Sequence, residues 1–84
     1  MVTVLFFASL RESLGTAREL VPLAAPNATV SMLVDALRAR DGAWGEAFGP
    51  GRTWRVAVNQ HMAHLATPLK AGDEVAFFPP VTGG

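Results

Sequence analysis

Runs of β-branched and aromatic residues mark four stretches of the chain as strands. The first, Val2 to Phe7, is apolar throughout and reads as a buried strand. A second strand is predicted over Arg18 to Leu23, closed by two nearby prolines. Further strands are predicted over Trp54 to Asn59 and, after an Ala-Gly-Asp turn, over Glu74 to Phe78. The region between these last two, His61 to Pro68, is expected to be a break.

Helical spacing appears in two places between the strands. The main helix is predicted to begin after an N-cap at Thr29, because four apolar residues follow at the spacing i, i+3, i+4, i+7: Val30, Leu33, Val34 and Leu37. A short helix is predicted at Ser9, where Ser9 and Glu12 have the spacing of a capping box and Gly15 follows as a stop. The stretch from Gly42 to Arg52, rich in glycine, is predicted to be an irregular connection pinned to the core by its aromatic residues, Trp44 and Phe48.

This order of elements predicts an α+β fold with one main helix across one face of a sheet. The first strand is apolar on both sides, whereas the helix covers only one face. Alternation along the first and last strands places four residues under the helix: Val4, Phe6, Val75 and Phe77. Phe7 and Phe78 would then lie on the other face, in an apolar patch open to a partner. The alternative, that the short helix or a loop covers them, stays open.

Composition narrows the functional classes. The chain has 84 residues, which we interpret as a single domain, 1–84. Seven basic and seven acidic residues give no net charge, so nothing favours binding to nucleic acid or a membrane. There is no cysteine, which excludes disulfides, thiolate metal sites and a cysteine nucleophile. The apolar N-terminus lacks the features of a signal peptide, so a cytoplasmic protein is expected and the sequon at Asn27 is interpreted as chance.

Two conventional site patterns find little support. His61 and His64 could share a face and bind zinc, but no third ligand lies near them in the sequence, so no metal site is predicted. Ser31, Asp35 and a histidine could form a hydrolytic triad only on paper, because nothing around them resembles a nucleophile elbow.

Residues 79–84, at the end of the sequence, form a segment that could take part in a reaction. Pro79 and Pro80 cannot donate to a strand ladder and favour an extended arm. Val81 and Thr82 can make contacts along it, whereas the Gly83-Gly84 pair has no Cβ and would fit a narrow channel. A terminal glycine carboxylate becomes reactive once it is activated, for example as an acyl-adenylate. The bare pair of glycines could also be a loose end.

Four stretches, "VLFFASLRE", "ATV", "VAVNQ" and "TPLKAGDEVAFFPPVTGG", resemble the small subunit of molybdopterin synthase. The resemblance runs through nearly the whole chain and implies a ubiquitin-like β-grasp fold, with a mixed β-sheet and one main α-helix. The related thiamine-pathway sulfur carriers share the G-D and G-G elements but usually lack "FFPP".

The resemblance also implies a function as a sulfur carrier. Gly84 would be adenylated by an E1-like enzyme that uses ATP, and then converted to a covalent thiocarboxylate; no bound cofactor is implied. The tail, 79–84, would enter the large synthase subunit, with Gly83 fitting the channel, and donate sulfur to a cyclic pyranopterin precursor. The chain would thus be a non-catalytic subunit of a heterotetramer. Matching interface positions are Phe7, Met62 and Phe78.

Three other functions stay open. The chain could carry sulfur for another pathway, such as thiamine synthesis, or act as a ubiquitin-like modifier joined through Gly84 to lysines of other proteins. It could also be an interaction module whose tail has no chemistry. No functional residue is predicted in the region Ala43 to Trp54.

Overall fold

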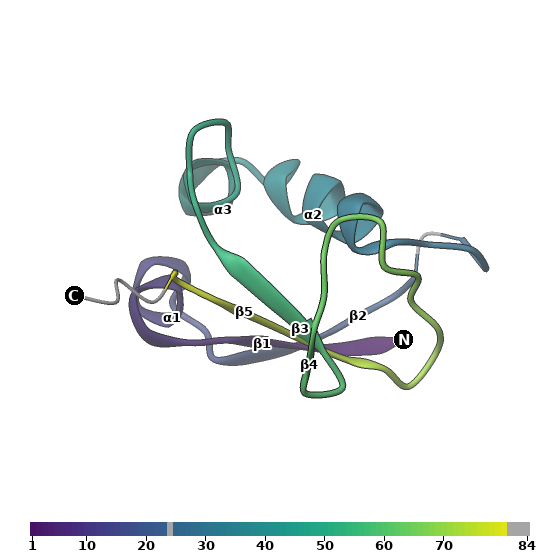
Figure 1. The fold of residues 1–84 in the computed structure, drawn as a ribbon. Coiled ribbons are helices and arrows are strands. Elements are labelled where there is room, and N and C mark those ends of the chain that lie inside the picture. Colours follow the sequence, from purple (N-terminus) through teal and green to yellow (C-terminus); the bar gives the residue numbers. More distant parts are fainter. Residues whose placement is uncertain (24, 81–84) are drawn as a thin grey trace.

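A computed structural model describes residues 1–23 and 25–80 of the protein (Figure 1). The elements along this part of the chain are β1 (Val2–Phe6), α1 (Ala8–Leu14), β2 (Arg18–Val21), α2 (Val30–Arg38), α3 (Gly42–Ala47), β3 (Arg55–Val58), β4 (His61–Met62) and β5 (Glu74–Phe78). None of the helices found there is long and apolar enough to cross a membrane.

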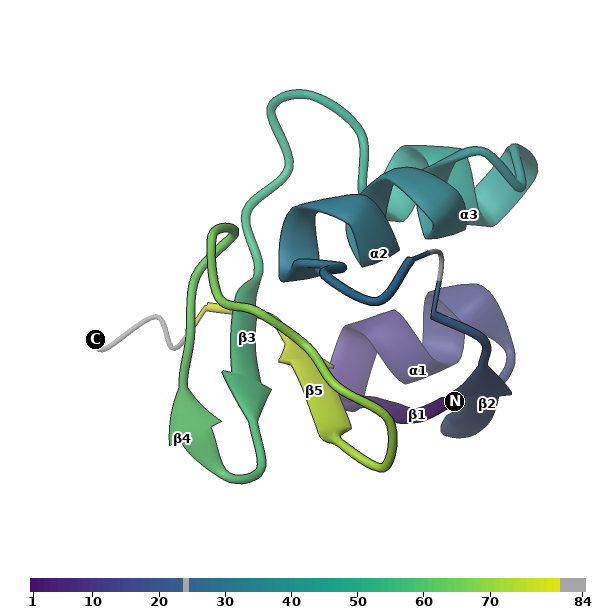
Figure 2. The same ribbon diagram turned by 90° about the vertical axis from the view of Figure 1, so that its right-hand side faces the viewer.

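The strands form one mixed sheet in the order β2-β1-β5-β3-β4. The central pair, β1 and β5, is parallel, and every other pairing is antiparallel. Figures 1 and 2 show α2 and α3 on one side of the sheet, with α1 beside the end at which β5 finishes. Over the described ranges, the opposite face carries no helix. The predicted α+β architecture is therefore confirmed, and one sheet face is left open.

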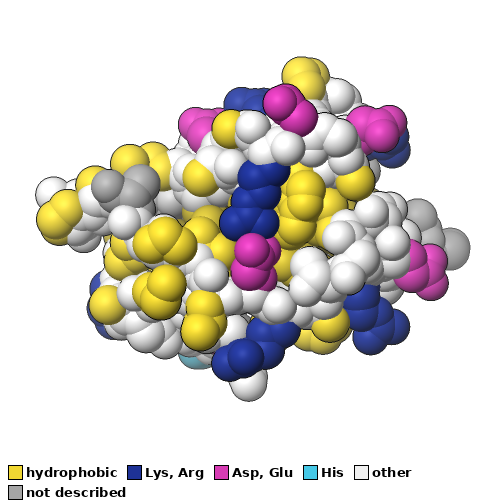
Figure 3. Space-filling view, turned by 180° about the vertical axis from the view of Figure 1, so that it is seen from behind, with side chains coloured by type: hydrophobic (Ala, Val, Ile, Leu, Met, Phe, Trp, Pro, Cys, Tyr) yellow, Lys and Arg dark blue, Asp and Glu magenta, His cyan; other side chains and the backbone are white. Residues whose placement is uncertain are grey.

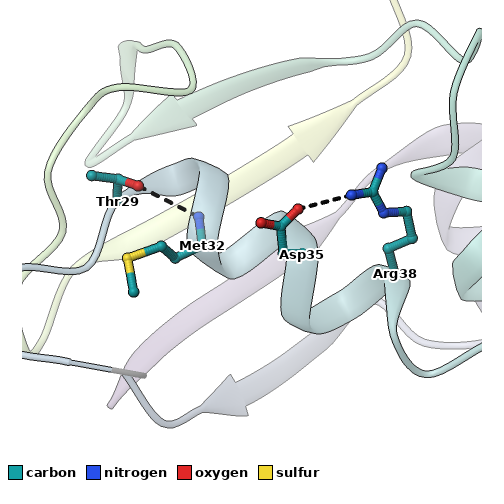
Figure 4. A network of polar contacts seen from close by, with 4 residues as sticks. All are labelled: Thr29, Met32, Asp35 and Arg38. Atoms are coloured by element: carbon teal, nitrogen blue, oxygen red, sulfur yellow. Dashed lines mark hydrogen bonds and ion pairs between the residues drawn. The ribbon is translucent and has the colours of Figure 1, made fainter.

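Helix α2 begins where the sequence predicted. Thr29 has extended backbone angles, and its Oγ1 accepts a hydrogen bond of 3.4 Å from the backbone N–H of Met32 (Figure 4). At the end of the helix, the Arg38 guanidinium pairs with the carboxylate of Asp35, one turn earlier, at 2.9 Å. All four predicted apolar positions of this helix are buried. An amphipathic helix with a side-chain cap at its N-terminus is thus packed on the sheet through its apolar stripe.

The core lies between α2 and the inner face of the sheet. The registers Val4↔Val75 and Phe6↔Phe77 join the central strands, and all four side chains are essentially inaccessible. This confirms the face assigned to them by alternation. In the parallel pair β1 and β5, matched residues share a face, so the intervening positions must point to the open side.

Helix α1 begins differently from the expectation. It starts at Ala8, directly after β1, and its N-cap is Phe7, which makes no side-chain capping bond. Ser9 therefore lies inside the first turn, and the predicted capping box is wrong. The chain changes direction through a positive φ of 51° at Ala8, and the carbonyl of Phe7 accepts from Leu10 N–H at 3.1 Å. Only Phe7 separates β1 from α1, so an apolar residue occupies the cap position and no polar side chain caps the helix. Gly15 ends this helix in the left-handed conformation, as predicted.

The region predicted to be irregular contains the helix α3. Glycine disfavours helix, but Trp44 packs edge-on against Phe6 with ring centroids 5.3 Å apart, and Phe48 is buried. Tertiary packing therefore overrides local propensity here, while the predicted pinning by the two aromatic residues is confirmed. A Cβ at Gly49 would lie 2.6 Å from the carbonyl oxygen of Gly45, so the turn after α3 requires glycine.

Strands β3 and β4 form a tight hairpin in place of the predicted break. Its two turn residues, Asn59 and Gln60, have φ of 50° and 69°. Positive φ at both positions is the conformation of a type I′ turn, whose usual sequence is Asn-Gly. Gln at the second position removes that sequence signal, and β4 has only two residues, so the strand was missed.

A buried carboxylate ties this hairpin to β5. Asp73 is only 5% exposed; its Oδ1 accepts from Asn59 Nδ2 at 2.9 Å and its Oδ2 from the backbone N–H of Lys70 at 2.9 Å. The Asn59 side chain also accepts from the N–H of Glu74. Burial raises the pKa of Asp73, but the two hydrogen bonds and the charge of Lys70 outweigh it, so the pKa lies below its usual value. The ionised form is thus the one that holds the two turns together.

Replacement of Asp73 by Asn is expected to lower the free energy of unfolding at pH 7 by about 1–3 kcal/mol, because the amide offers one acceptor oxygen in place of two and turns its NH2 donor toward the other buried donor. The lowered pKa means that the stabilisation is present above the unfolded value, about 3.9, and is lost as the pH falls through the folded value. Urea unfolding at pH 7 and below pH 4 checks this. The difference in the free energy of unfolding between wild type and Asp73→Asn should be smaller below pH 4 than at pH 7. A difference that does not depend on pH would contradict the assignment.

Candidate functional site

Strand β5 is held by aromatic packing at its last buried residue. Phe77 is fully buried and meets the rings of Phe6, Phe48 and Trp54 at centroid distances of 6.2, 5.1 and 5.3 Å. Two of these partners lie in the region 43–54, for which the sequence predicted no functional residue. Their spacing gave no sign of this contact, because it joins residues about 25 positions apart along the chain. The region therefore fixes the point from which the chain leaves the sheet.

The chain leaves the sheet immediately after this anchor. Strand β5 ends at Phe78, and Pro79 and Pro80 follow without regular secondary structure, both half-buried. Neither proline has an N–H, so the ladder between β5 and its neighbours cannot continue through them. The remaining predicted tail residues, Val81, Thr82, Gly83 and Gly84, lie outside the described residues.

The predicted interface residues lie on the open face of the sheet. Met62 is 62% exposed, Phe7 is 46% exposed and Phe78 is half-buried. Phe7 continues the extended backbone of β1 beyond Phe6, so alternation turns it to this face beside Phe78. Helix α1 does not cover them, since it buries Leu10 toward the core instead. The structure thus leaves these apolar side chains accessible, while their role in docking stays a prediction.

The middle of the open face carries small side chains. The register Leu5↔Ala76↔Ala57↔Met62 runs across four strands, so these four side chains form one row on this side. The two central members are alanines, flanked by larger apolar residues. Such a row lets the surface of a partner approach the sheet closely between Leu5 and Met62.

Two grooves border the point at which the tail leaves the sheet. The first, about 500 Å³, lies between α1 and α3 and includes Pro79 in its lining. The second, about 830 Å³, lies between α2, the connection 48–54, β3 and the chain that follows β4, and includes Pro80. Arg52 lines both grooves. The tail base is therefore surrounded by concave surface.

The alternative sites considered from the sequence do not assemble. Among residues 1–23 and 25–80, no three histidine, cysteine or acidic side chains come together as metal ligands. Ser31 and Asp35 both lie on α2, where the Asp35 carboxylate bonds to Arg38. Neither pattern offers a centre to compete with the tail and the open face.

Comparisons with known proteins agree with this geometry. The model of the ThiS family matches residues 4–84. Over 84 residues, all of both chains, the protein is 45% identical to the molybdopterin synthase sulfur carrier subunit of Escherichia coli (strain K12). Its structure is similar to that of SAMP1, a small archaeal modifier protein from Haloferax volcanii, with a TM-score of 0.80 and 34% identity over 99% of this chain and 98% of that one.

Another similar structure is a complex. It contains subunits 1 and 2 of the molybdopterin-converting factor from Helicobacter pylori, with a TM-score of 0.68 and 28% identity over 99% of this chain and 97% of the matched chain. These similarities confirm the β-grasp fold implied by the sequence motifs. Full-length identity and the family match together show that the chain belongs to the ThiS family, among the molybdopterin synthase sulfur carrier subunits.

Proposed function

We propose that this protein carries sulfur as a thiocarboxylate on Gly84 and donates it, within molybdopterin synthase, to a cyclic pyranopterin precursor. The observation that carries this proposal is identity along the whole chain to a sulfur carrier subunit of that synthase. The absence of cysteine fits it, because the sulfur must then be held on another group.

The chemistry rests on the carboxylate of Gly84. An activating enzyme of the E1 type joins it to AMP from ATP and releases pyrophosphate, which makes the carbonyl carbon electrophilic. A sulfur nucleophile then displaces AMP and leaves the thiocarboxylate. The carrier is not a catalyst by itself: it presents one atom to two partners. Glycine at positions 83 and 84 keeps side chains away from the attacked carbon.

The fold holds the base of the tail in a defined position. The aromatic packing of Phe77 fixes the end of β5, and Pro79 and Pro80 restrict the backbone that follows. A reacting group must be held to within about 1 Å to keep its rate, so an anchored tail base has a direct chemical value.

The proposed partner for donation is the large synthase subunit, in a heterotetramer with two small and two large subunits. Support comes from the Helicobacter pylori complex of subunits 1 and 2, whose matched chain has the same fold. We assign docking to the open-face residues Phe7, Met62 and Phe78, and channel contacts to the tail, 79–84. Exposed apolar side chains beside the point at which the tail leaves the sheet suit an interface that is buried only in the complex.

A second candidate function is protein modification through Gly84, favoured by the similarity to SAMP1. Sulfur carriage for another pathway, such as thiamine synthesis, is a third. The fold is common to all of them, so the chemistry of the tail must decide.

Intact-mass measurement tests the proposal. Co-expression with an activating enzyme and a sulfur source should shift the mass of the chain by the exchange of one oxygen for one sulfur, and fragmentation should place that sulfur on Gly84. Addition of purified large subunit and precursor should return the mass to its starting value. Lysine-linked adducts without sulfur transfer would favour the modifier, and an unchanged mass beside a converted known carrier would refute sulfur carriage.

A further inference from the structure

The larger groove at the tail base has an apolar floor and exposed apolar walls. Its floor includes Val34, Phe48, Trp54 and Val56, which belong to the core or pack against it. Leu65, 51% exposed, lies in its wall. A groove of about 830 Å³ with this lining is large enough for one or two side chains of another protein.

The charges in this groove are not balanced. Among the described residues of its lining, Asp35 is the only acidic one, and it is already paired with Arg38. Arg52 also lines the groove and forms no ion pair within the described ranges, whereas Arg55, which lies opposite Phe78 in the register, has its side chain on the open face. Arginine presents a planar set of donors that matches a carboxylate. An occupant that combines an apolar side chain with a carboxylate would therefore complement both the floor and the rim.

The groove is continuous with the proposed docking face. Met62 belongs to the open-face row and also lines the groove, so both surfaces meet at the edge strand β4. Arg55 lies opposite Phe78 in the register of β3 and β5. Pro80 lines the end of the groove. A partner that covers the open face and takes the tail would thus reach the groove without crossing uncovered surface.

Exposed apolar side chains also occur elsewhere, so apolarity alone does not single out the groove. Figure 3 shows hydrophobic side chains gathered on the side of the molecule where the chain begins. Leu20 on β2, 53% exposed, lies at the edge of the sheet opposite β4. Arg18, on the same strand, is likewise exposed and without an ion pair in the described part of the chain. These two residues match Leu65 and Arg52 in type and exposure, but their register partners, Thr3 and Leu5, place them on the open face and away from the groove.

We propose that this groove receives a segment of the large synthase subunit in which an apolar side chain stands next to an aspartate or glutamate. The inference rests on the proposed function, because it takes the large subunit as the partner. The segment would pass around β4, place its apolar side chain against Leu65 and Trp54, and pair its carboxylate with Arg52.

The test compares charge and apolar substitutions inside the groove with the same kinds of change outside it. Arg52→Glu and Leu65→Asp alter the groove, while Arg11→Glu on α1 and Met32→Asp on α2 change exposed residues that do not line it. Affinity for purified large subunit is measured by titration calorimetry at low and high salt, and Phe78→Arg reports on the open face. Each groove variant should bind at least about tenfold more weakly at low salt, with the controls within about twofold, since rim charges act on association and its salt dependence. The salt dependence should be smaller for Arg52→Glu than for wild type.

Each alternative outcome has a distinct meaning. Wild-type affinity in both groove variants would overturn the inference and leave the proposed function intact. Equal losses in the groove variants and the controls would also overturn it, because they would reflect net charge or stability in place of a local contact. Urea unfolding of every variant identifies a loss of stability, and Leu65→Ala supplies a second apolar variant of the groove if Leu65→Asp fails to fold. Failure of the wild-type chain itself to bind the large subunit would refute the proposed partner, and the inference with it.

Discussion

Addition of one alanine after Gly84 is expected to abolish sulfur donation while leaving the fold unchanged. One further residue moves the terminal carboxylate by about 3.3–3.6 Å along an extended chain. A misplacement of about 1 Å can already cost a factor of about 100 in rate. The added residue also puts a Cβ next to the reacting carbon, in a channel proposed to fit glycine. Transfer of sulfur to the precursor should therefore fall at least about 100-fold.

The matched control carries the same alanine before Met1, which lies at the end of the central parallel strands away from Phe78 (Figure 1). It should donate sulfur at the wild-type rate, and both variants should unfold at the wild-type urea concentration. Intact mass must verify that the extended chain is not trimmed during the assay. An untrimmed extended chain that donates sulfur as fast as the control would show that the tail mechanism is wrong.

Replacement of Phe77 by alanine is expected to cause the largest loss of stability of any change near the site. Its side chain is fully buried, stacks on Phe6 and meets Phe48 and Trp54 edge to face. Removal of such a ring leaves a cavity and costs about 3–5 kcal/mol. Domains of this size have about 5–15 kcal/mol in total, so Phe77→Ala should remain folded only in part or melt well below wild type.

Phe78→Ala is the matched control, because it removes the same ring from the adjacent residue on the open face. Phe78 is half-buried, so the expected loss is about 1.5 kcal/mol or less. Urea unfolding followed by tryptophan fluorescence measures both, since Trp54 lies against Phe77. Similar losses in the two variants would contradict the assignment of Phe77 as the anchor of β5.

The parts of the fold that could be predicted from the sequence are those in which local pattern and burial coincide. Alternation along β1 and β5 assigned Phe6 and Phe77 to the core and Phe7 and Phe78 to the open face, since successive strand residues point to opposite sides. The cap at Thr29 was equally readable, because its bond joins residues three apart. Neither feature depends on the rest of the chain.

The errors lie where distant contacts decide local structure. Helix α3 forms despite its glycines because Trp44 and Phe48 pack on Phe6. The hairpin at Asn59 is held by Asp73, which is 14 residues further along the chain. Neither contact produces a repeating pattern of residues from which it could be predicted.

By itself, the sequence determined the strands β1, β2, β3 and β5, the main helix α2, the inner and outer faces of the central strands, and the motifs of the tail, because each depends on residues that are close along the chain. Only the tertiary structure decided which region anchors the tail base and that a positively charged groove adjoins it. Phe48, Trp54 and Arg52 come next to β5 through packing across the sheet, and the free energy that holds them there belongs to contacts between segments far apart in the sequence.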